Sequence, residues 1–273
     1  MEIIEKGNEW RDRYARWWQQ ERAAFAGSGK DVGDNYPWAT NKRAPFVPAR
    51  RALPMLNLAL LSSAGAYIDG TEPFNVSARG GDMSFREIPV EVEAEDLKWA
   101  ARGYDPKSVE QDMNAQVPIK RLFEFESNGI IGQLNPVFWS FCGFITDAER
   151  MVREMIPGLI ERVRRYEVQA ALLIPASRLC HQSVSLVARA LELEGIPTMT
   201  LAVERDVVEM VRPPRAAYYR GELGSVAGLP DWPEHQRRIL DEALRLIEPI
   251  DQPGTRNLTV ELQSEVEKER GER

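Results

Sequence analysis

A serine, a cysteine and a histidine gather at one turn of this chain, within residues 175–183. The apolar run 168–174 before it has the character of a strand, and a helix-period run follows from residue 184. A strand that turns directly into a helix exposes the junction and points the first helical N–H groups outward, which favours anions and lowers the pKa of a thiol. Cys180 is therefore our candidate nucleophile or redox thiol.

The neighbours of Cys180 set its expected reactivity. His181 follows it and Arg178 precedes it by two residues, and a positive charge on either would favour the thiolate. Ser177 fits a weak nucleophile, a hydrogen-bond donor to a substrate carboxylate, or a plain helix N-cap. A buried, inert cysteine at a strand–helix junction is the alternative for Cys180. The second cysteine, Cys142, is flanked by aromatic residues and is expected to be a core thiol.

Charged and small residues elsewhere supply a substrate-binding set. Arg86 follows a glycine pair and suits bidentate capture of a carboxylate, although a structural Arg–Glu pair would explain it equally well. Small residues at the end of an apolar strand let a ligand approach closely. A polar helical segment after residue 105 is either a substrate site or a structural network. The predicted substrate-binding residues are Ser62, Ser63, Asp82, Arg86, Glu87, Asp112, Asn114 and Arg121.

Strand and helix patterns alternate along the chain, so we predict an α/β fold of mainly parallel sheets with flanking helices, with two Rossmann-like halves considered. Ligand sites in such sheets lie beyond the carboxyl ends of the strands. Helix-capping boxes are predicted at Thr146 and Asp231, a kink at Pro157, and a solvated His235. The expected strands are 56–61, 84–92, 129–134, 168–174, 196–203 and 215–219, and the expected helices 8–26, 105–127 with a break at Pro118, 147–163, 181–194, a short one from Asp206, and 233–248.

Three regions divide the chain. We expect an N-terminal helix and arm over 1–54, an α/β core over 55–250 with halves 55–145 and 146–250, and a flexible tail over 251–273. The first helix carries an aromatic stripe, which packs on its own body or on a dimer mate, or else serves a membrane surface or a partner. The stripe comprises Trp10, Tyr14, Trp17, Trp18 and Phe25.

Composition excludes several classes of function. The net charge of −7 disfavours nucleic acid, whose phosphates need a basic face. No apolar run suits a membrane span, and the N-terminus lacks the pattern of a signal peptide. Two cysteines and two histidines without metal-ligand spacing predict no metal site, and no nucleotide fingerprint is present, so no cofactor is expected. We expect a cytoplasmic homo-oligomer.

Many short motifs, in order, cover about two thirds of the chain. Together they resemble the selenoprotein B family of glycine, sarcosine and betaine reductases, with the related D-proline reductase subunit. The motifs are Leu61-Ser62-Ser63-Ala64-Gly65, Glu72-Pro73-Phe74, Gly81-Asp82-Met83-Ser84-Phe85-Arg86-Glu87-Ile88-Pro89, Tyr104-Asp105, Asp112-Met113-Asn114, Pro118-Ile119-Lys120-Arg121-Leu122, Gly129-Ile130-Ile131-Gly132, Cys180-His181-Gln182-Ser183, Leu191-Glu192, Gly195-Ile196-Pro197-Thr198 and Pro214-Arg215.

The resemblance implies a nucleophile three residues before the retained cysteine, a position that is Ser177 here. In the family, a selenocysteine or cysteine there displaces an amine from the substrate, the second thiol resolves the adduct, and a thioredoxin-like donor resets the pair. A serine hydroxyl cannot form that sulfur–sulfur or selenium–sulfur bond. The family's histidine before Tyr104-Asp105 is also absent, since the local sequence begins Ala100-Ala101-Arg102-Gly103.

Two principal functions remain open on the sequence. The first is a thiol-dependent oxidoreductase similar to selenoprotein B, acting on a small amine- or carboxylate-bearing substrate through Cys180, Ser177 and His181, with a thioredoxin-like donor or a second subunit. The second is a non-redox small-molecule-binding or partner-subunit protein derived from the same family. Cofactor-independent racemase chemistry ranks last, because it needs two opposed acid/base groups.

Overall fold

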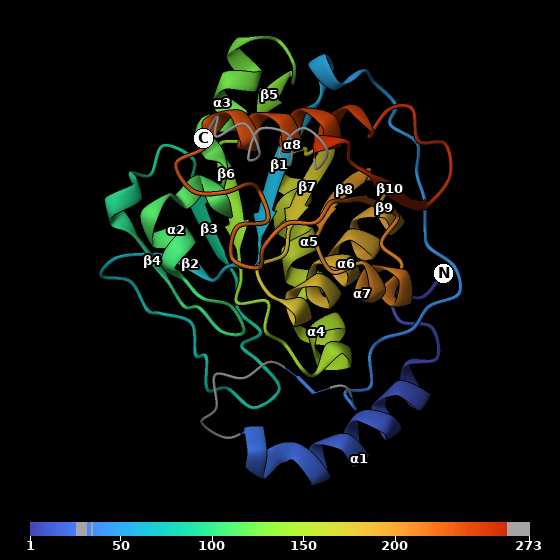
Figure 1. Cartoon of the computed structure of the whole chain (residues 1–273). Coiled ribbons are helices and arrows are strands. Elements are labelled where there is room, and N and C mark those ends of the chain that lie inside the picture. The colour runs from blue at the N-terminus through green and yellow to red at the C-terminus, as the bar shows by residue number, and fades with distance from the viewer. Residues whose placement is uncertain (26–31, 34, 261–273) are drawn as a thin grey trace.

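The structure is a computed structural model of the 273-residue chain and describes residues 1–25, 32–33 and 35–260. Helices and strands alternate through the core (Figure 1). The strands are β1 Asn57–Ser62, β2 Ala66–Ile68, β3 Arg86–Pro89, β4 Leu97–Trp99, β5 Gln133–Leu134, β6 Val137–Ser140, β7 Ala170–Ile174, β8 Thr198–Ala202, β9 Arg215–Tyr218 and β10 Gly254–Asn257. The α-helices are α1 Gly7–Phe25, α2 Lys107–Gln111, α3 Ile119–Ser127, α4 Ala148–Glu154, α5 Ile156–Arg165, α6 Arg178–Leu193, α7 Arg205–Val211 and α8 Pro233–Arg245, and short 3-10 turns span Leu53–Met55, Ala94–Asp96 and Met113–Ala115.

One large sheet forms the centre of the molecule. Its strands lie in the order β10-β9-β8-β7-β1-β6-β3, with β5 also paired to β1. All of these pairs are parallel except β3 with β6, while β2 and β4 form a separate antiparallel pair. The predicted α/β class with a mainly parallel sheet is confirmed.

Strands β1 and β7 are apolar without alternation because both faces of the sheet are covered. Ala59 and Leu61 pack into the hydrophobic cluster that contains residues of α1, α4, α5, α6 and α7. Leu58 and Leu60 pack into the opposite cluster, with α3 and α8. The sheet is therefore the middle of three layers.

Strand β1 lies between β7 and β6, so the direction of chain progression reverses beside it. The halves considered at 55–145 and 146–250 thus share one sheet, because β1 pairs with β7 over residues 58–62 and 170–174. In open parallel sheets, ligands bind outside the carboxyl ends of the strands at such a reversal. The segments that leave this point are 63–65 after β1 and 175–177 after β7.

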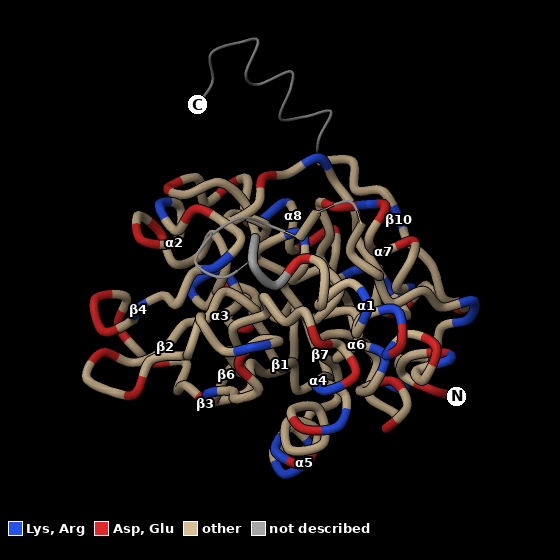
Figure 2. Tube along the Cα trace, turned by 90° about the horizontal axis from the view of Figure 1, so that it is seen from below, with Lys and Arg blue, Asp and Glu red and all other residues tan. Residues whose placement is uncertain are grey.

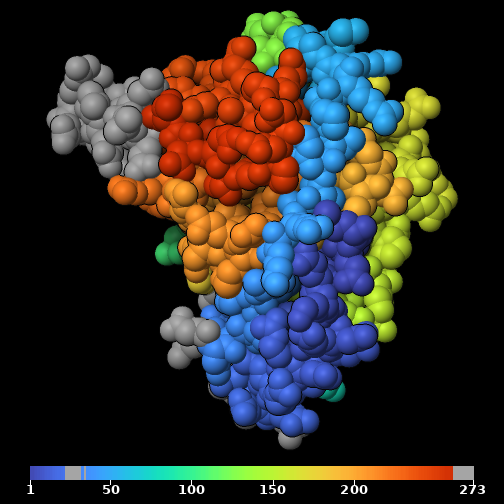
Figure 3. All heavy atoms as spheres, turned by 90° about the vertical axis from the view of Figure 1, so that its right-hand side faces the viewer, coloured from blue at the N-terminus to red at the C-terminus, as the bar shows by residue number. Residues whose placement is uncertain are grey.

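The aromatic stripe of α1 packs on the chain's own body. Trp10 and Trp17 are 1% and 4% exposed, and Tyr14 Oη lies 3.2 Å from Thr146 Oγ1 just before α4. The side chain of Phe25 lies outside the described residues. The arm that follows α1 crosses one side of the molecule, beside the C-terminal elements (Figure 3). Of the roles considered for this stripe, packing on its own fold is confirmed.

Four local predictions are corrected or completed by the structure. The N-cap of α4 is Asp147, not Thr146, because the Asp147 carboxylate accepts from Arg150 N at 3.1 Å. The N-cap of α8 is Trp232, without a capping side chain.

His235 is buried rather than solvated, since its Nδ1 accepts from Leu229 N and its ring stacks on Trp232. The predicted kink at Pro157 is confirmed, because the helix is divided at Met155 into α4 and α5.

The predicted flexible tail over 251–273 is wrong for its first part. Residues 254–257 form β10, which extends the sheet by pairing in parallel with β9. Leu258 and Val260 are buried in the cluster that contains α8. The remainder of the predicted tail, 261–273, lies outside the described residues.

Candidate functional site

Cys180 sits in the first turn of α6, at the reversal beside β1 and β7, and is only 1% exposed. Its Sγ lies 3.1 Å from Ser177 Oγ and donates to Ser63 O at 3.7 Å. Its apolar neighbours are Ala64, Ala176, Trp99 and Tyr104. We call these seven residues the thiol centre.

The thiol of Cys180 is protonated in this environment. Burial raises its pKa and outweighs the hydrogen bonds from Ser177 and Ser63 that act in the opposite direction. The sequence-based expectation of a lowered thiol pKa is therefore wrong, because the helix start is not open to solvent.

His181 does not place a positive charge beside Cys180. Its Nδ1 lies 2.7 Å from Ser177 O, and its Nε2 accepts from Val203 N at 3.1 Å and from Glu204 N at 3.3 Å. A ring whose Nε2 accepts two N–H bonds cannot also carry a proton there. Burial lowers the pKa of His181 to about 4, so the imidazole is neutral near pH 7.

Arg178 is engaged away from the sulfur. Its guanidinium forms ion pairs with Glu204, the N-cap residue of α7, and with Asp206 in the first turn of that helix. Ser177 is the N-cap of α6, with Oγ accepting from Cys180 N at 3.2 Å. The N-cap interpretation of Ser177 is confirmed, and its hydroxyl is fully buried.

Two serines at the end of β1 hold the centre together. Ser63 Oγ accepts from Ala176 N at 3.1 Å and donates to Ile174 O, which ties the ends of β1 and β7. Ser62 Oγ accepts from Ala64 N at 3.4 Å. Both hydroxyls therefore serve the backbone around Cys180, where a ligand at this reversal would approach.

Cys142 lies two residues after β6 and forms an isolated antiparallel β-bridge with the backbone of Ala64. It is 4% exposed, its Sγ donates to Ala100 O at 3.6 Å, and burial raises its pKa to about 12. It belongs to the hydrophobic cluster that contains α4 and α5. The core-thiol prediction for Cys142 is confirmed.

The charged residues on and before β3 have local partners. The Arg86 guanidinium lies over the Phe74 ring at 4.3 Å and donates to Ser84 Oγ and Glu72 O. The Glu87 carboxylate pairs with Arg162, and this holds its pKa below the usual range. Among the described residues Arg86 forms no ion pair with a glutamate, so the structural Arg–Glu pair considered as the alternative for Arg86 is not present, and Arg86 and Glu87 make separate contacts.

Asp82 lies in the loop before β3, which is an edge strand of the large sheet. Its carboxylate accepts from Asn75 N at 2.6 Å and from Ser84 N at 2.8 Å, and it organises the loop before β3. Among the described residues, none of the hydrogen bonds and ion pairs of Asp82, Arg86 and Glu87 reaches a residue of the thiol centre.

Asp112 and Asn114 line a polar cavity of about 630 Å³ between the β2–β4 pair and α2. Asp112 Oδ1 accepts from Asn114, and Oδ2 accepts from Gln236 and Asp231 N. Arg121 lies apart, paired with Glu124 at 3.1 Å. The full lining is Tyr67, Ala94, Glu95, Leu97, Lys98, Trp99, Val109, Glu110, Gln111, Asp112, Met113, Asn114, Lys120 and Asp231.

Trp99 joins the two places, because it lines the polar cavity and also packs against the thiol centre. Sequence reasoning did not single out Trp99, Tyr104 or Lys120. Tyr104 and Lys120 lie within the family motifs, which was the available signal for them. No sequence signal pointed to Trp99, because its role depends on how the end of β4 lies against the segment that follows β1.

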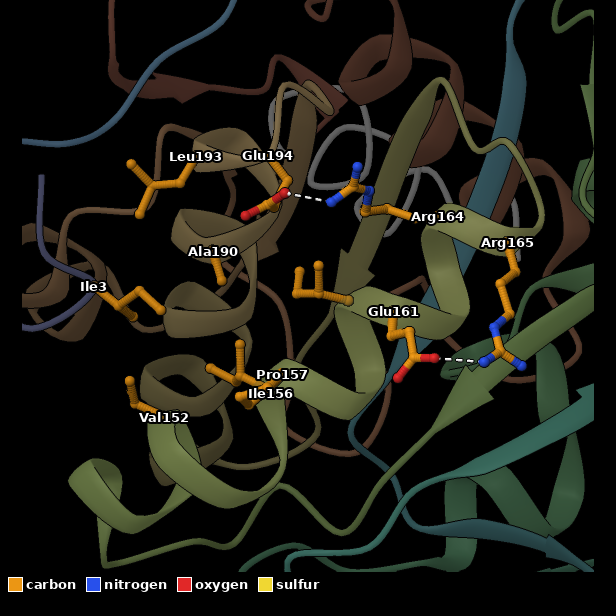
Figure 4. Close-up of a pocket in the computed structure, with 11 residues that line it drawn as sticks. Ile3, Val152, Ile156, Pro157, Glu161, Arg164, Arg165, Ala190, Leu193 and Glu194 are labelled. Atoms are coloured by element: carbon orange, nitrogen blue, oxygen red, sulfur yellow. Dashed lines mark hydrogen bonds and ion pairs between the residues drawn. The ribbon is translucent and has the colours of Figure 1, made fainter.

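A second cavity, of about 600 Å³, is an apolar groove between α5 and α6 on the layer that contains α4 (Figure 4). Ile156, Ile160 and Leu193 line it, and the ion pairs Arg164–Glu194 and Glu161–Arg165 border it. None of the residues of the thiol centre lines this groove.

Comparison with known proteins decides the family. The model of glycine/sarcosine/betaine reductase selenoprotein B matches residues 28–176, which is more than half of the 273 residues. The chain belongs to this family. The match runs from the arm through β7 and ends at Ala176, directly before the Ser177 of the thiol centre.

Two relatives of this selenoprotein B family member are named as subunits of reductases. It is 31% identical to D-proline reductase subunit gamma of Acetoanaerobium sticklandii, over 77% of this chain and 85% of that protein. It is 26% identical to glycine reductase complex component B subunit gamma of Symbiobacterium thermophilum, over 82% of this chain and 53% of that protein. The chain therefore spans about half the length of the glycine reductase subunit. No solved structure matches this family member.

Further properties of the described residues bear on the predicted partners. No helix in residues 1–25, 32–33 and 35–260 is long and apolar enough to cross a membrane. Within the same residues, no three His, Cys, Asp or Glu side chains gather as a metal site would require. Basic and acidic residues are interspersed along the trace seen from below (Figure 2).

Proposed function

We propose that this chain is a subunit of a reductase-type complex that binds a small amine- or carboxylate-bearing molecule where β1 and β7 end. Cys180 is the sulfur that reacts there. The observation that carries this proposal is the position of Cys180 at the reversal of the sheet, 3.1 Å from Ser177 Oγ. Membership of a family of reductase subunits supports the reaction class.

Cys180 must first become accessible and lose its proton, because a buried neutral thiol is a poor nucleophile. The thiolate then attacks the substrate carbon, a C–S bond forms, and the C–N bond breaks with its electron pair leaving on the amine. A thiolate of a thioredoxin-like donor or a second subunit attacks Cys180 Sγ, so that an S–S bond forms while the carbon takes the C–S electrons and a proton. A second donor thiol then frees Cys180. Ser177 takes no electrons in this sequence.

A second candidate is a non-redox protein of the same family that binds a small molecule or a partner subunit. The raised pKa of Cys180 and the neutral His181 favour it, because together they describe a sulfur held in its unreactive form.

Substrate consumption separates the two candidates. Purified protein is incubated with D-proline or glycine, chosen because relatives are named for them, and with a dithiol and thioredoxin as donors. Loss of substrate together with one equivalent of dithiol per turnover, abolished in Cys180→Ala and retained in Cys142→Ala, supports the thiol-dependent reductase. Binding without any consumption, by wild type and both variants alike, supports the non-redox protein instead.

A further inference from the structure

The polar cavity and the thiol centre share one wall. The indole of Trp99 lines the cavity, and the same side chain packs against the cluster of Ala64, Ala176 and Cys180. Cys180 itself does not line the cavity and is 1% exposed. Any ligand in the cavity is therefore next to the tryptophan that separates it from the sulfur.

Backbone and side-chain contacts hold the segment that carries this wall. Trp99 ends β4, whose described partner is the three-residue strand β2. Tyr104 Oη donates to Ala64 O at 2.7 Å, and Ala100 N donates to Gly65 O at 2.9 Å. Between Trp99 and Tyr104 lies Gly103, whose φ of +79° suits a residue without a side chain. A displacement of this segment that carried Trp99 away from Ala64 and Ala176 would remove the side chain that the cavity and the thiol centre share.

The cavity offers charges of both signs. Among the described residues, Lys120 Nζ and the carboxylates of Glu95 and Glu110 form no ion pair and no side-chain hydrogen bond. Asp112 is different, because its oxygens accept from Asn114, Gln236 and the Asp231 backbone. Lys98 is paired with Asp69 at 3.5 Å. Lys120, Glu95 and Glu110 are thus the charged cavity groups that are available to a ligand, and of the two carboxylates Glu110 is the one that also acts on Tyr104.

Glu110 also acts electrostatically on Tyr104, a residue of the thiol centre. Burial raises the pKa of Tyr104, and Cys180, Cys142 and the charge of Glu110 contribute in the same direction. A carboxylate that lines the cavity is thus close enough to the thiol centre to act on one of its side chains.

We propose that this polar cavity is an outer binding chamber for a small molecule that carries both a carboxylate and an ammonium group, and that Trp99 is the partition between the chamber and Cys180. Lys120 receives the carboxylate and Glu110 the ammonium group. A volume of about 630 Å³ is within the range of small-molecule sites and leaves room for the side chain of the ligand. The inference rests on the proposed function, and it adds the site at which the ligand waits before the partition opens.

Calorimetry on the full chain tests the chamber. The probes are D-proline and glycine, which carry both charges, with propionate and pyrrolidine, which each carry one. We expect binding of at least one two-charge probe and at least tenfold weaker binding of both single-charge probes. Lys120→Met and Glu110→Gln are each expected to weaken the two-charge probe at least tenfold. The matched controls Lys107→Met and Glu126→Gln lie on the same helices outside the cavity and should bind as wild type does.

Alkylation tests the partition. In a Cys142→Ser background, where Cys180 is the only thiol, Trp99→Ala should raise the rate of Cys180 alkylation by iodoacetamide at least tenfold, whereas Leu193→Ala in the distant groove should not. A urea unfolding curve shows whether Trp99→Ala remains folded. Trp99→Phe removes less of the side chain, so its rate of Cys180 alkylation should fall between the rates of the Cys142→Ser parent and of Trp99→Ala.

The two proposals fail in different ways. If wild type consumes substrate while Lys120→Met and Glu110→Gln bind and turn over like wild type, the chamber is wrong and the proposed function stands. If the two-charge probe binds through Lys120 and Glu110 but is never consumed, the reductase proposal is wrong and the chamber stands. Equal alkylation rates in wild type and a folded Trp99→Ala would remove the partition.

Discussion

Ser177 Oγ lies 3.1 Å from Cys180 Sγ, with the hydroxyl also accepting the backbone N–H of Cys180. The two side chains are therefore in contact at the first turn of α6, at the spacing where the family resemblance implies a reactive pair. A serine in this place keeps the helix capped while it removes one of the two atoms that could exchange electrons.

Replacing Ser177 with cysteine should restore a redox-active pair. We expect Ser177→Cys, treated with hydrogen peroxide, to form a disulfide between the introduced thiol and Cys180, with two thiols oxidised and the peroxide reduced to water. Intact-mass and peptide mapping would detect the loss of two hydrogens. Ser185→Cys, on the same helix but outside the pair, is the control for an added thiol. If Ser177→Cys stays a dithiol under conditions that oxidise a free thioredoxin, the contact does not have the geometry of an exchangeable pair.

Removing the hydroxyl tests its capping role separately. Ser177→Ala leaves the N–H of Cys180 without its side-chain acceptor, and loss of an N-cap typically lowers the free energy of unfolding by about 1 kcal/mol. Urea denaturation at pH 7 measures this loss. Ser177→Thr, which keeps an acceptor oxygen, serves as the comparison, with the added methyl group close to Gly103. No stability loss in Ser177→Ala would show that the cap contributes nothing here.

The buried His181 predicts a stability loss on mild acidification. Its pKa is about 4 in the folded chain and 6.5 in the reference state, so the unfolded chain binds a proton first as the pH falls. The stabilising contribution is complete above pH 6.5 and is lost between pH 6.5 and 4, by up to about 3 kcal/mol. The physical reason is that Nε2 accepts two backbone N–H bonds and cannot be protonated without breaking them.

The measurement compares wild type with His181→Gln across this pH range. The glutamine does not titrate, so the carboxylate contributions common to both proteins cancel in the difference. We expect wild type to lose more stability than the variant between pH 6.5 and 4, and both to change in parallel above pH 7. Parallel curves over the whole range would contradict a neutral, buried His181.

Patterns along the sequence were enough to predict the parallel sheet and the strand–helix junction at Cys180. Apolar runs such as 170–174 are typical of strands buried on both faces, and the structure places them in the middle layer. Asp112 and Asn114 line a cavity, and their role in substrate binding stays a prediction. These successes depend on local signals that survive in any context.

What failed depended on burial, which a local pattern cannot report. His181 and Arg178 look like activators of Cys180 in sequence, but α6 is buried at its start and both side chains turn to residues 203–206. The first part of the tail was misjudged for a related reason, since residues 254–257 lack the apolar residues typical of a strand and form one by pairing with the edge of β9. Tertiary contacts, rather than propensity, decided each case.

Gly143 is predicted to be a position beside the thiol centre at which an added side chain is not tolerated. It follows Cys142 directly, its N donates to Ser63 O, and Ser183 Oγ donates to its carbonyl. A Cβ at Gly143 would lie 2.5 Å from Ser63 Cβ and 2.9 Å from Cys180 Sγ, distances that real Cβ atoms do not show. Because the backbone here is anchored between β1 and α6, the new methyl group must push the serine and the sulfur apart.

We expect Gly143→Ala to lower the free energy of unfolding by about 1–3 kcal/mol, as overpacking of a filled interior usually does. The same variant should expose Cys180, so that its alkylation in the Cys142→Ser background becomes faster than in the parent. Gly158→Ala is the matched control, because it lies inside α5 and, among the described residues, its added Cβ would meet Phe85 alone, at 3.6 Å. That control should gain stability, by roughly 1 kcal/mol, from better helix propensity. A Gly143→Ala protein as stable as wild type, with an unchanged alkylation rate, would mean that the backbone around Ser63 and Cys180 yields easily, and the thiol centre would then have to be regarded as loosely packed.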